Sequence, residues 1–119
     1  MAALAPAGGL QCSSDEMLSY LDFISKPGNA KAQAIVDTLL SPTARLSPTV
    51  SIGRGWHTLE RKNKPVIYWH NGGTFGFSTF AAFVKSTGQA VIVVVNGFNK
   101  NAVSDGLGMA IIKKMLDEK

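Results

Sequence analysis

The 119-residue chain is long enough for one domain with a core, because a chain of this size buries about two thirds of the surface that its unfolded form exposes. Hydrophobic residues make up 45% and charged residues 17% of the chain, which is ordinary globular usage and argues against disorder. The net charge of +4 comes from scattered basic residues, so we expect a solvated basic surface and no nucleic-acid site.

The chain offers few ligands for a metal. Cys12 is the single cysteine, and His57 and His70 are the only histidines, so neither a disulfide within the chain nor a cysteine metal cluster is expected. We expect no cofactor. No apolar run approaches the roughly 20 residues of a membrane span, and residues 1–10 lack the basic start and apolar core of a signal peptide. The expectation is a cytoplasmic protein that does not associate with membranes.

The N-terminal third predicts two helices after an extended lead-in. Ser13 and Glu16 have the spacing of a capping box, and the apolar residues that follow recur at helical intervals over Ser14–Ser25. A second amphipathic pattern covers Ala30–Leu40, and Pro42 ends it because proline cannot continue a helix. Each helix should bury one face only.

After a loop over Ser41–Ser51 the pattern changes to strands. Short polar or glycine-containing turns separate the apolar runs, which predicts antiparallel neighbours. We expect two hairpins, formed by Gly53–Glu60 with Val66–Asn71 and by Phe75–Lys85 with Gln89–Asn96.

The run Ala90–Val95 is apolar without alternation, which indicates a strand that is covered on both faces. A last helix over Ala102–Asp117, with Asn101 as its cap, would supply one cover. Its expected apolar stripe consists of Val103, Leu107, Ala110, Ile111 and Met115. The fold class is therefore α+β, a single domain over residues 1–119 with an antiparallel sheet of about four strands.

The segment Tyr68–Phe83 holds a glycine-rich corner, His70-Asn71-Gly72-Gly73-Thr74. Glycine lets a ligand approach the backbone closely, and peptide N–H groups at such a corner can face an anion or a polarised carbonyl. The apolar surroundings predict that four phenylalanines nearby belong to the core: Phe75, Phe77, Phe80 and Phe83.

This corner resembles the third active-site box, Lys-Thr-Gly or His-x-Gly, of the penicillin-recognising serine hydrolases, which include class C β-lactamases and DD-peptidases. Two further motifs resemble that family in the same order, the helix entry that begins Pro6-Ala7-Gly8-Gly9-Leu10 and the strand Gly53-Arg54-Gly55-Trp56. The resemblance covers nearly the whole chain. It implies the C-terminal portion of a β-lactamase/transpeptidase-like fold.

The resemblance also implies roles at the box. His70 would face the cleft, the Gly73 N–H would be half of an oxyanion hole, and Asn71, Gly72 and Thr74 would bind substrate. The family's other two boxes are absent from this sequence, because no serine has a lysine three positions later and neither a Tyr-x-Asn nor a Ser-x-Asn occurs. A purely structural reading, in which His70 is a strand-end histidine and the glycines permit a bend, therefore stays open.

Two hypotheses follow from this sequence. In the first, the chain is a truncated β-lactamase-like domain without hydrolase activity of its own, a folded binding or interaction module. In the second, it is half of a serine hydrolase, completed by a separate N-terminal chain that carries the nucleophile. In either case an exposed strand edge near Val91–Val95, or the C-terminal helix, predicts a homo-oligomer.

Overall fold

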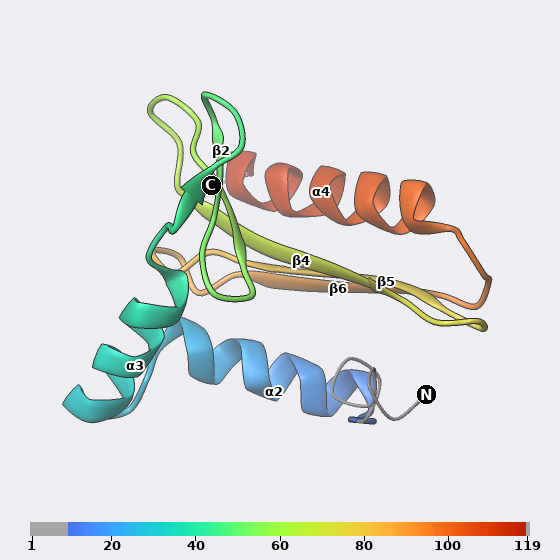
Figure 1. Ribbon diagram of the computed structural model, residues 1–119, viewed down its shortest axis with the longest axis horizontal. Coiled ribbons are helices and arrows are strands. Elements are labelled where there is room, and N and C mark those ends of the chain that lie inside the picture. Colours follow the sequence, from blue (N-terminus) through green and yellow to red (C-terminus); the bar gives the residue numbers. More distant parts are fainter. Residues whose placement is uncertain (1–9, 119) are drawn as a thin grey trace.

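The computed structural model describes residues 10–118, which form a sheet covered by helices on both faces (Figure 1). Helix α4 lies on one face, and α2 lies on the other with α3 beside its end. The motif residues Pro6–Gly9 lie outside the described residues. Within residues 10–118 the order is α2 (Ser14–Ser25), α3 (Ala30–Leu40), β1 (Ala44–Arg45), β2 (Val50–Ile52), β3 (His57–Leu59), β4 (Ile67–Gly73), β5 (Ser78–Phe83), β6 (Ala90–Val95) and α4 (Asn101–Asp117).

Both N-terminal helices begin at side-chain caps, and their predicted bounds are confirmed. The Ser13 hydroxyl accepts a hydrogen bond from the Glu16 N–H at 3.1 Å, while the Glu16 carboxylate accepts one from the Ser13 N–H at 2.8 Å. Asn29 caps α3 by accepting from the N–H of Ala32 at 2.9 Å. These local bonds satisfy backbone donors that a helix start leaves unpaired, which is why the sequence alone defines both starts.

The sheet is antiparallel throughout, with the strand order β1-β2-β3-β4-β5-β6 in the described residues. The α+β class is confirmed, but six strands replace the expected four. Two short strands lie within or next to the segment 41–51 that we predicted to be a loop, and the expected strand Gly53–Glu60 begins only at His57. The reason is a tight turn between β2 and β3, in which Gly55 has a φ of 95° and the Gly53 N–H donates to the Trp56 carbonyl at 2.8 Å.

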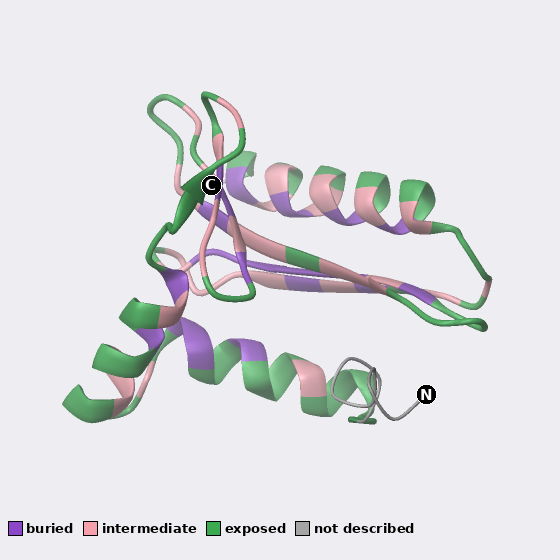
Figure 2. Cartoon of the chain, in the orientation of Figure 1, coloured by how far each residue is buried: buried purple, intermediate pink, exposed green. Residues whose placement is uncertain are grey.

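Two hydrophobic clusters fill the space between the layers. The cluster under α4 contains Ile67, Phe80, Ala82, Val84, Val91, Val93, Ile112 and Leu116. The cluster under α2 and α3 contains Leu21, Ile24, Val36, Leu40, Trp56, Ala81 and Phe83. Figure 2 shows the buried side of α4 turned toward the sheet. Strand β6 contributes to both clusters, which confirms the prediction that it is covered on both faces.

Helix α4 is rotated relative to the expected stripe. Its buried residues are Ser104, Gly108, Ile112 and Leu116, whereas Val103 and Leu107 are half exposed. The Phe80 ring lies so close to Gly108 that a Cβ there would overlap it, so small residues face the sheet at this level. The expected Asn101 cap is also wrong: Lys100 is the N-cap, and the Asn101 side chain donates instead to the carbonyl of Gly72 at 2.9 Å.

Two of the four phenylalanines predicted to lie in the core are exposed. Phe80 and Phe83 are fully buried, but the exposed fraction is 86% for Phe75 and 48% for Phe77. Strand β5 begins only at Ser78, so the two exposed rings belong to the β4–β5 loop, and Phe75 stacks on Phe98 with ring centroids 5.8 Å apart. The buried strand therefore begins later than the apolar run indicates.

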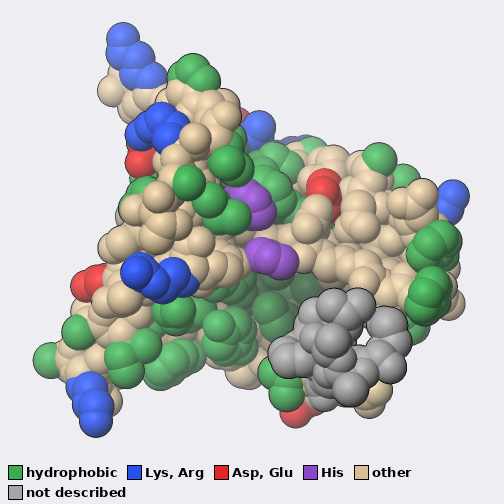
Figure 3. Space-filling model, viewed as in Figure 1, with side chains coloured by type: hydrophobic (Ala, Val, Ile, Leu, Met, Phe, Trp, Pro, Cys, Tyr) green, Lys and Arg blue, Asp and Glu red, His purple; other side chains and the backbone are tan. Residues whose placement is uncertain are grey.

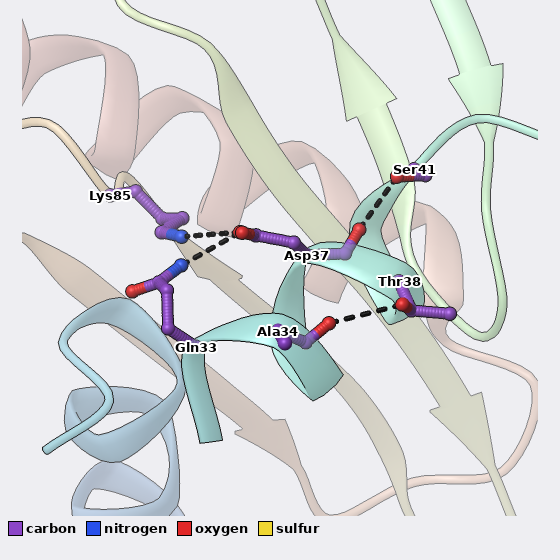
Figure 4. Close-up of polar contacts among 6 residues, drawn as sticks. All are labelled: Gln33, Ala34, Asp37, Thr38, Ser41 and Lys85. Atoms are coloured by element: carbon purple, nitrogen blue, oxygen red, sulfur yellow. Dashed lines mark hydrogen bonds and ion pairs between the residues drawn. The ribbon is translucent and has the colours of Figure 1, made fainter. Parts of the chain in front are cut away.

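A polar cluster attaches α3 to the end of β5 (Figure 4). The Asp37 carboxylate accepts a hydrogen bond from the Gln33 amide at 2.7 Å and is 3.5 Å from the Lys85 ammonium. The Asp37 carbonyl also accepts from the Ser41 hydroxyl where the helix ends. Because Asp37 is exposed, its ion pair with Lys85 adds little to the free energy of unfolding and mainly orients α3 relative to the end of β5.

Candidate functional site

The glycine-rich corner forms the second half of β4. Strand β3 pairs with β4 from His57, opposite Trp69, to Leu59, opposite Ile67, and goes no further. From His70 to Gly73, β4 pairs with β5 alone among the described residues. One backbone edge of the box is therefore open.

Hydrogen-bond alternation shows which backbone groups face this open edge. The Thr74 N–H donates to the Phe77 carbonyl at 2.9 Å, so this pair is hydrogen-bonded across the β4–β5 ladder. Antiparallel ladders alternate bonded and non-bonded pairs, which makes Gly73 with Ser78 and Asn71 with Phe80 non-bonded pairs. The N–H and C=O groups of Gly73 and Asn71 therefore point away from β5. A backbone N–H group that points outward from an open strand edge is the kind of donor that stabilises an oxyanion.

Aromatic rings surround the His70 side chain at this edge. Its ring lies edge-on to Trp56, with centroids 6.4 Å apart, and 5.9 Å from the ring of His57. His57 in turn stacks on Trp69 with centroids 4.2 Å apart. Figure 3 shows both histidines on one face of the molecule, bordered by hydrophobic side chains. His70 is exposed, so it is accessible to a ligand.

His57 belongs to none of the motifs in the sequence. It is partly buried, because the β2–β3 turn places it opposite Trp69. Burial lowers the pKa of His57 below its ordinary value, and the charge of nearby His70 lowers this pKa further. Its neutral form is thus favoured beside the box. The sequence pattern placed the start of this strand at Gly53, whereas β3 begins at His57. Only the register of β3 against β4 shows that His57 lies beside the box.

The side chain of Asn71 turns to the opposite face of β4 from His70. Its amide donates to the Asp105 carboxylate of α4 at 2.8 Å, and Asn101, one helical turn earlier, donates to the Gly72 carbonyl. The resemblance implies that the Asn71 side chain binds substrate, whereas in the structure this side chain is already hydrogen-bonded within the protein. Through these two hydrogen bonds, helix α4 holds the box on the face opposite His70.

Thr74 and the two box glycines are tightly packed within the corner. The Thr74 hydroxyl accepts from the N–H groups of Gly76 and Phe77 at 3.3 and 3.2 Å, so it stabilises the turn. A Cβ on Gly72 would lie 2.9 Å from the Thr79 hydroxyl, and one on Gly73 would lie 3.2 Å from the Asn101 side-chain oxygen. Close packing alone therefore favours glycine at both positions.

Other kinds of site find little support in the described residues. Among residues 10–118, no group of three histidine, cysteine, aspartate or glutamate side chains is placed to hold a metal ion. No helix in that range has the length and hydrophobicity needed to cross a membrane. The box edge is thus the candidate functional site that the geometry supports.

Comparisons with known proteins agree with this geometry. The family model described as Beta-lactamase matches residues 1–114. No curated protein matches the chain. Among solved structures, a D-stereospecific amidohydrolase from Streptomyces sp. matches with a TM-score of 0.58 and 16% identity, over 72% of this chain and 26% of that one. That likeness shows the fold, and the chain spans about a quarter of that protein. The match over nearly all of its residues shows that the chain belongs to the Beta-lactamase family.

Proposed function

We propose that this β-lactamase-like chain does not hydrolyse substrates by itself and acts as a folded binding or interaction module built around the His70–Gly73 strand. The observation that carries the proposal is the combination of an open box edge with the missing nucleophile boxes. The edge can receive a polar group, but covalent catalysis in this family needs an activated serine, and no serine of this sequence has the lysine partner at the required spacing.

The proposed binding surface has a defined chemistry. The outward N–H of Gly73 would donate to a carbonyl or carboxylate oxygen of a ligand, and the exposed His70 ring would add a second polar contact. The buried Trp56 ring would pack against the His70 ring and hold it in place. In this proposal Asn71 and Thr74 contribute by holding the strand, Asn71 through its bond to Asp105 and Thr74 through the turn. Gly72 allows close approach to the backbone.

Hydrolysis assays on the purified chain test the first half of this proposal. A chromogenic cephalosporin and a short-chain nitrophenyl ester should show no turnover, and intact-mass spectrometry should show no acyl adduct. The His70→Ala variant is the site control, and Ile35→Ala, at an exposed position on α3, is the matched surface control. Turnover that survives repurification and Ile35→Ala but disappears in His70→Ala would contradict the proposal.

The outward Gly73 N–H supports a second candidate, half of a serine hydrolase that a separate chain completes. An oxyanion hole needs two donors, and this strand edge would supply one of them to a nucleophile carried elsewhere. Losing one such donor costs a working enzyme about 3 kcal/mol, so each half would depend strongly on the other.

Coexpression tests this second candidate. A polypeptide that carries Ser-x-x-Lys and Tyr-x-Asn boxes should copurify with this chain, and hydrolysis should appear only in the complex. His70→Ala should lower the activity of the complex without preventing copurification, while Ile35→Ala should change neither. Failure of the two polypeptides to associate would count against the candidate and leave the binding-module proposal standing.

A further inference from the structure

The only two histidines of the sequence meet at the point where β3 stops covering β4. His57 is the first residue of β3 and pairs with Trp69, and His70 is the next residue of β4 beyond that pairing. The ring centroids of the two histidines are 5.9 Å apart, and Figure 3 shows both rings on one face of the molecule. Two imidazoles from neighbouring strands therefore lie together at the surface.

The two rings reach this point from opposite faces of the sheet. His57 stacks on Trp69 with centroids 4.2 Å apart, and Trp69 packs against the cluster under α4. His70 lies edge-on to Trp56, which belongs to the cluster under α2 and α3. His57 is partly buried and held by stacking, whereas His70 is exposed and can turn about its side-chain bonds. The pair combines one fixed ring with one adjustable ring.

One ring nitrogen of this pair has no partner within the described part of the chain. Nδ1 of His57 is shielded from water and makes no hydrogen bond to any of the residues 10–118. Buried polar atoms in folded proteins nearly always have a partner, because an unpaired one keeps the full cost of its desolvation. A group from outside the chain that binds between the rings would offset this cost.

We propose that His57 and His70 together bind one divalent transition-metal cation of the Cu²⁺ and Zn²⁺ class. Zn–N bonds of about 2.0–2.1 Å place the centroids of two imidazoles on one tetrahedral ion about 5 Å apart. The observed separation exceeds that value by less than about 1 Å, which a small rotation of the exposed His70 ring removes. Imidazole nitrogen suits these ions, whereas Mg²⁺ and Ca²⁺ take oxygen ligands.

Two protein ligands leave coordination positions open. Zinc sites in proteins usually have three or four protein ligands, and no group of three histidine, cysteine, aspartate or glutamate side chains forms within residues 10–118. We therefore expect an exchangeable ion with water in the remaining positions. A carbonyl or carboxylate oxygen bound at the box edge would replace one of these waters; this last step rests on the proposed function, and the cation site does not.

Tryptophan fluorescence reports directly on this site. Trp56 and Trp69 are the only tryptophans of the chain, and each contacts one of the two histidine rings. In a Cys12→Ser background, which removes the exposed thiol as a competing ligand, Cu²⁺ should quench the emission with one ion bound per chain. Calorimetry with Zn²⁺ alone should give the same stoichiometry, and Mg²⁺ should give no binding at the same concentrations.

Histidine variants show whether both rings hold the ion. His57→Gln and His70→Gln should each weaken Cu²⁺ and Zn²⁺ binding at least about tenfold, because each removes one of two ligands. Ile35→Ala, at an exposed position on α3, should leave binding unchanged. Circular dichroism checks that the variants are folded, and since His70 is exposed, His70→Gln decides the question even if His57→Gln does not fold.

Four outcomes would overturn the cation site. These are emission that Cu²⁺ leaves unchanged, full affinity in a folded histidine variant, one ion shared by two chains, and binding of Mg²⁺ as tight as that of Zn²⁺. None of these measurements involves hydrolysis or a ligand at the box edge. Failure of the cation site is therefore distinguishable from failure of the proposed function.

Discussion

Two glycines on α4 allow the packing against the sheet to be tested within one helix. A Cβ added at Gly106 would meet nothing within 4 Å, whereas a Cβ at Gly108 would lie 2.8 Å from Cγ of Phe80 and closer still to Cδ1. Phe80 is 1% exposed and its ring stacks on Trp69 with centroids 5.9 Å apart, so the ring has little freedom to move. The two Gly→Ala variants therefore share the same change in helix propensity and differ in the packing penalty.

The expected effects have opposite signs. Replacing glycine by alanine inside a helix gains about 0.8–1 kcal/mol, so Gly106→Ala should stabilise the protein by nearly that amount. At Gly108 the same gain is set against overpacking, which costs about 1–3 kcal/mol and should lie at the upper end for contacts this short. We expect Gly108→Ala to lose about 2 kcal/mol, which separates the two variants by about 3 kcal/mol.

Urea denaturation followed by circular dichroism measures the difference. With a slope of about 2 kcal/mol per molar urea, Gly108→Ala should lower the midpoint by about 1 M and Gly106→Ala should raise it by about 0.4 M. Unchanged slopes would show that the folded states stay comparable. Equal midpoints for the two variants would refute the conclusion that Phe80 determines which face of α4 lies on the sheet.

Three further predictions concern the helix start, pH and the box. Ser13→Ala should lower the unfolding free energy by about 1 kcal/mol in urea denaturation, because the α2 capping box is lost; an unchanged midpoint would contradict this. Because burial and His70 lower the folded-state pKa of His57, the unfolded chain binds that proton more readily, so the melting temperature should fall as pH drops below about 6.5. His57→Gln should remove this part of the pH dependence, and an identical pH profile would count against it. Asn101→Ala should speed amide hydrogen exchange in the box strand at Gly72, with little change in α2; unaltered exchange would show that α4 does not hold the box.

Local signals in the sequence predicted much of this fold. The bounds of α2 and α3 follow from capping side chains within three residues of each helix start. The strand Ala90–Val95 follows from an apolar run between turn residues. The resemblance to the family was recognised from short motifs, and the family match confirms that resemblance.

The rotation of α4 and the surroundings of the box depended on contacts between distant parts of the chain. Helical periodicity predicted that one face of α4 is buried, but Val103 and Leu107 look better suited to a core than Ser104 and Gly108. Only the position of the Phe80 ring decides between these faces, since it leaves room for small side chains alone.

The sequence by itself determined the helix starts, the apolar strand and the resemblance to the family, because caps, turns and motifs act over a few neighbouring residues. The tertiary structure decided that His57 lies beside His70, that Asn71 bonds to Asp105, and that one edge of the box is open. These features depend on strand register and on side chains far apart in the chain. A shift of register by one residue would turn every side chain of a strand to the other face, and no local pattern defines the register that closely.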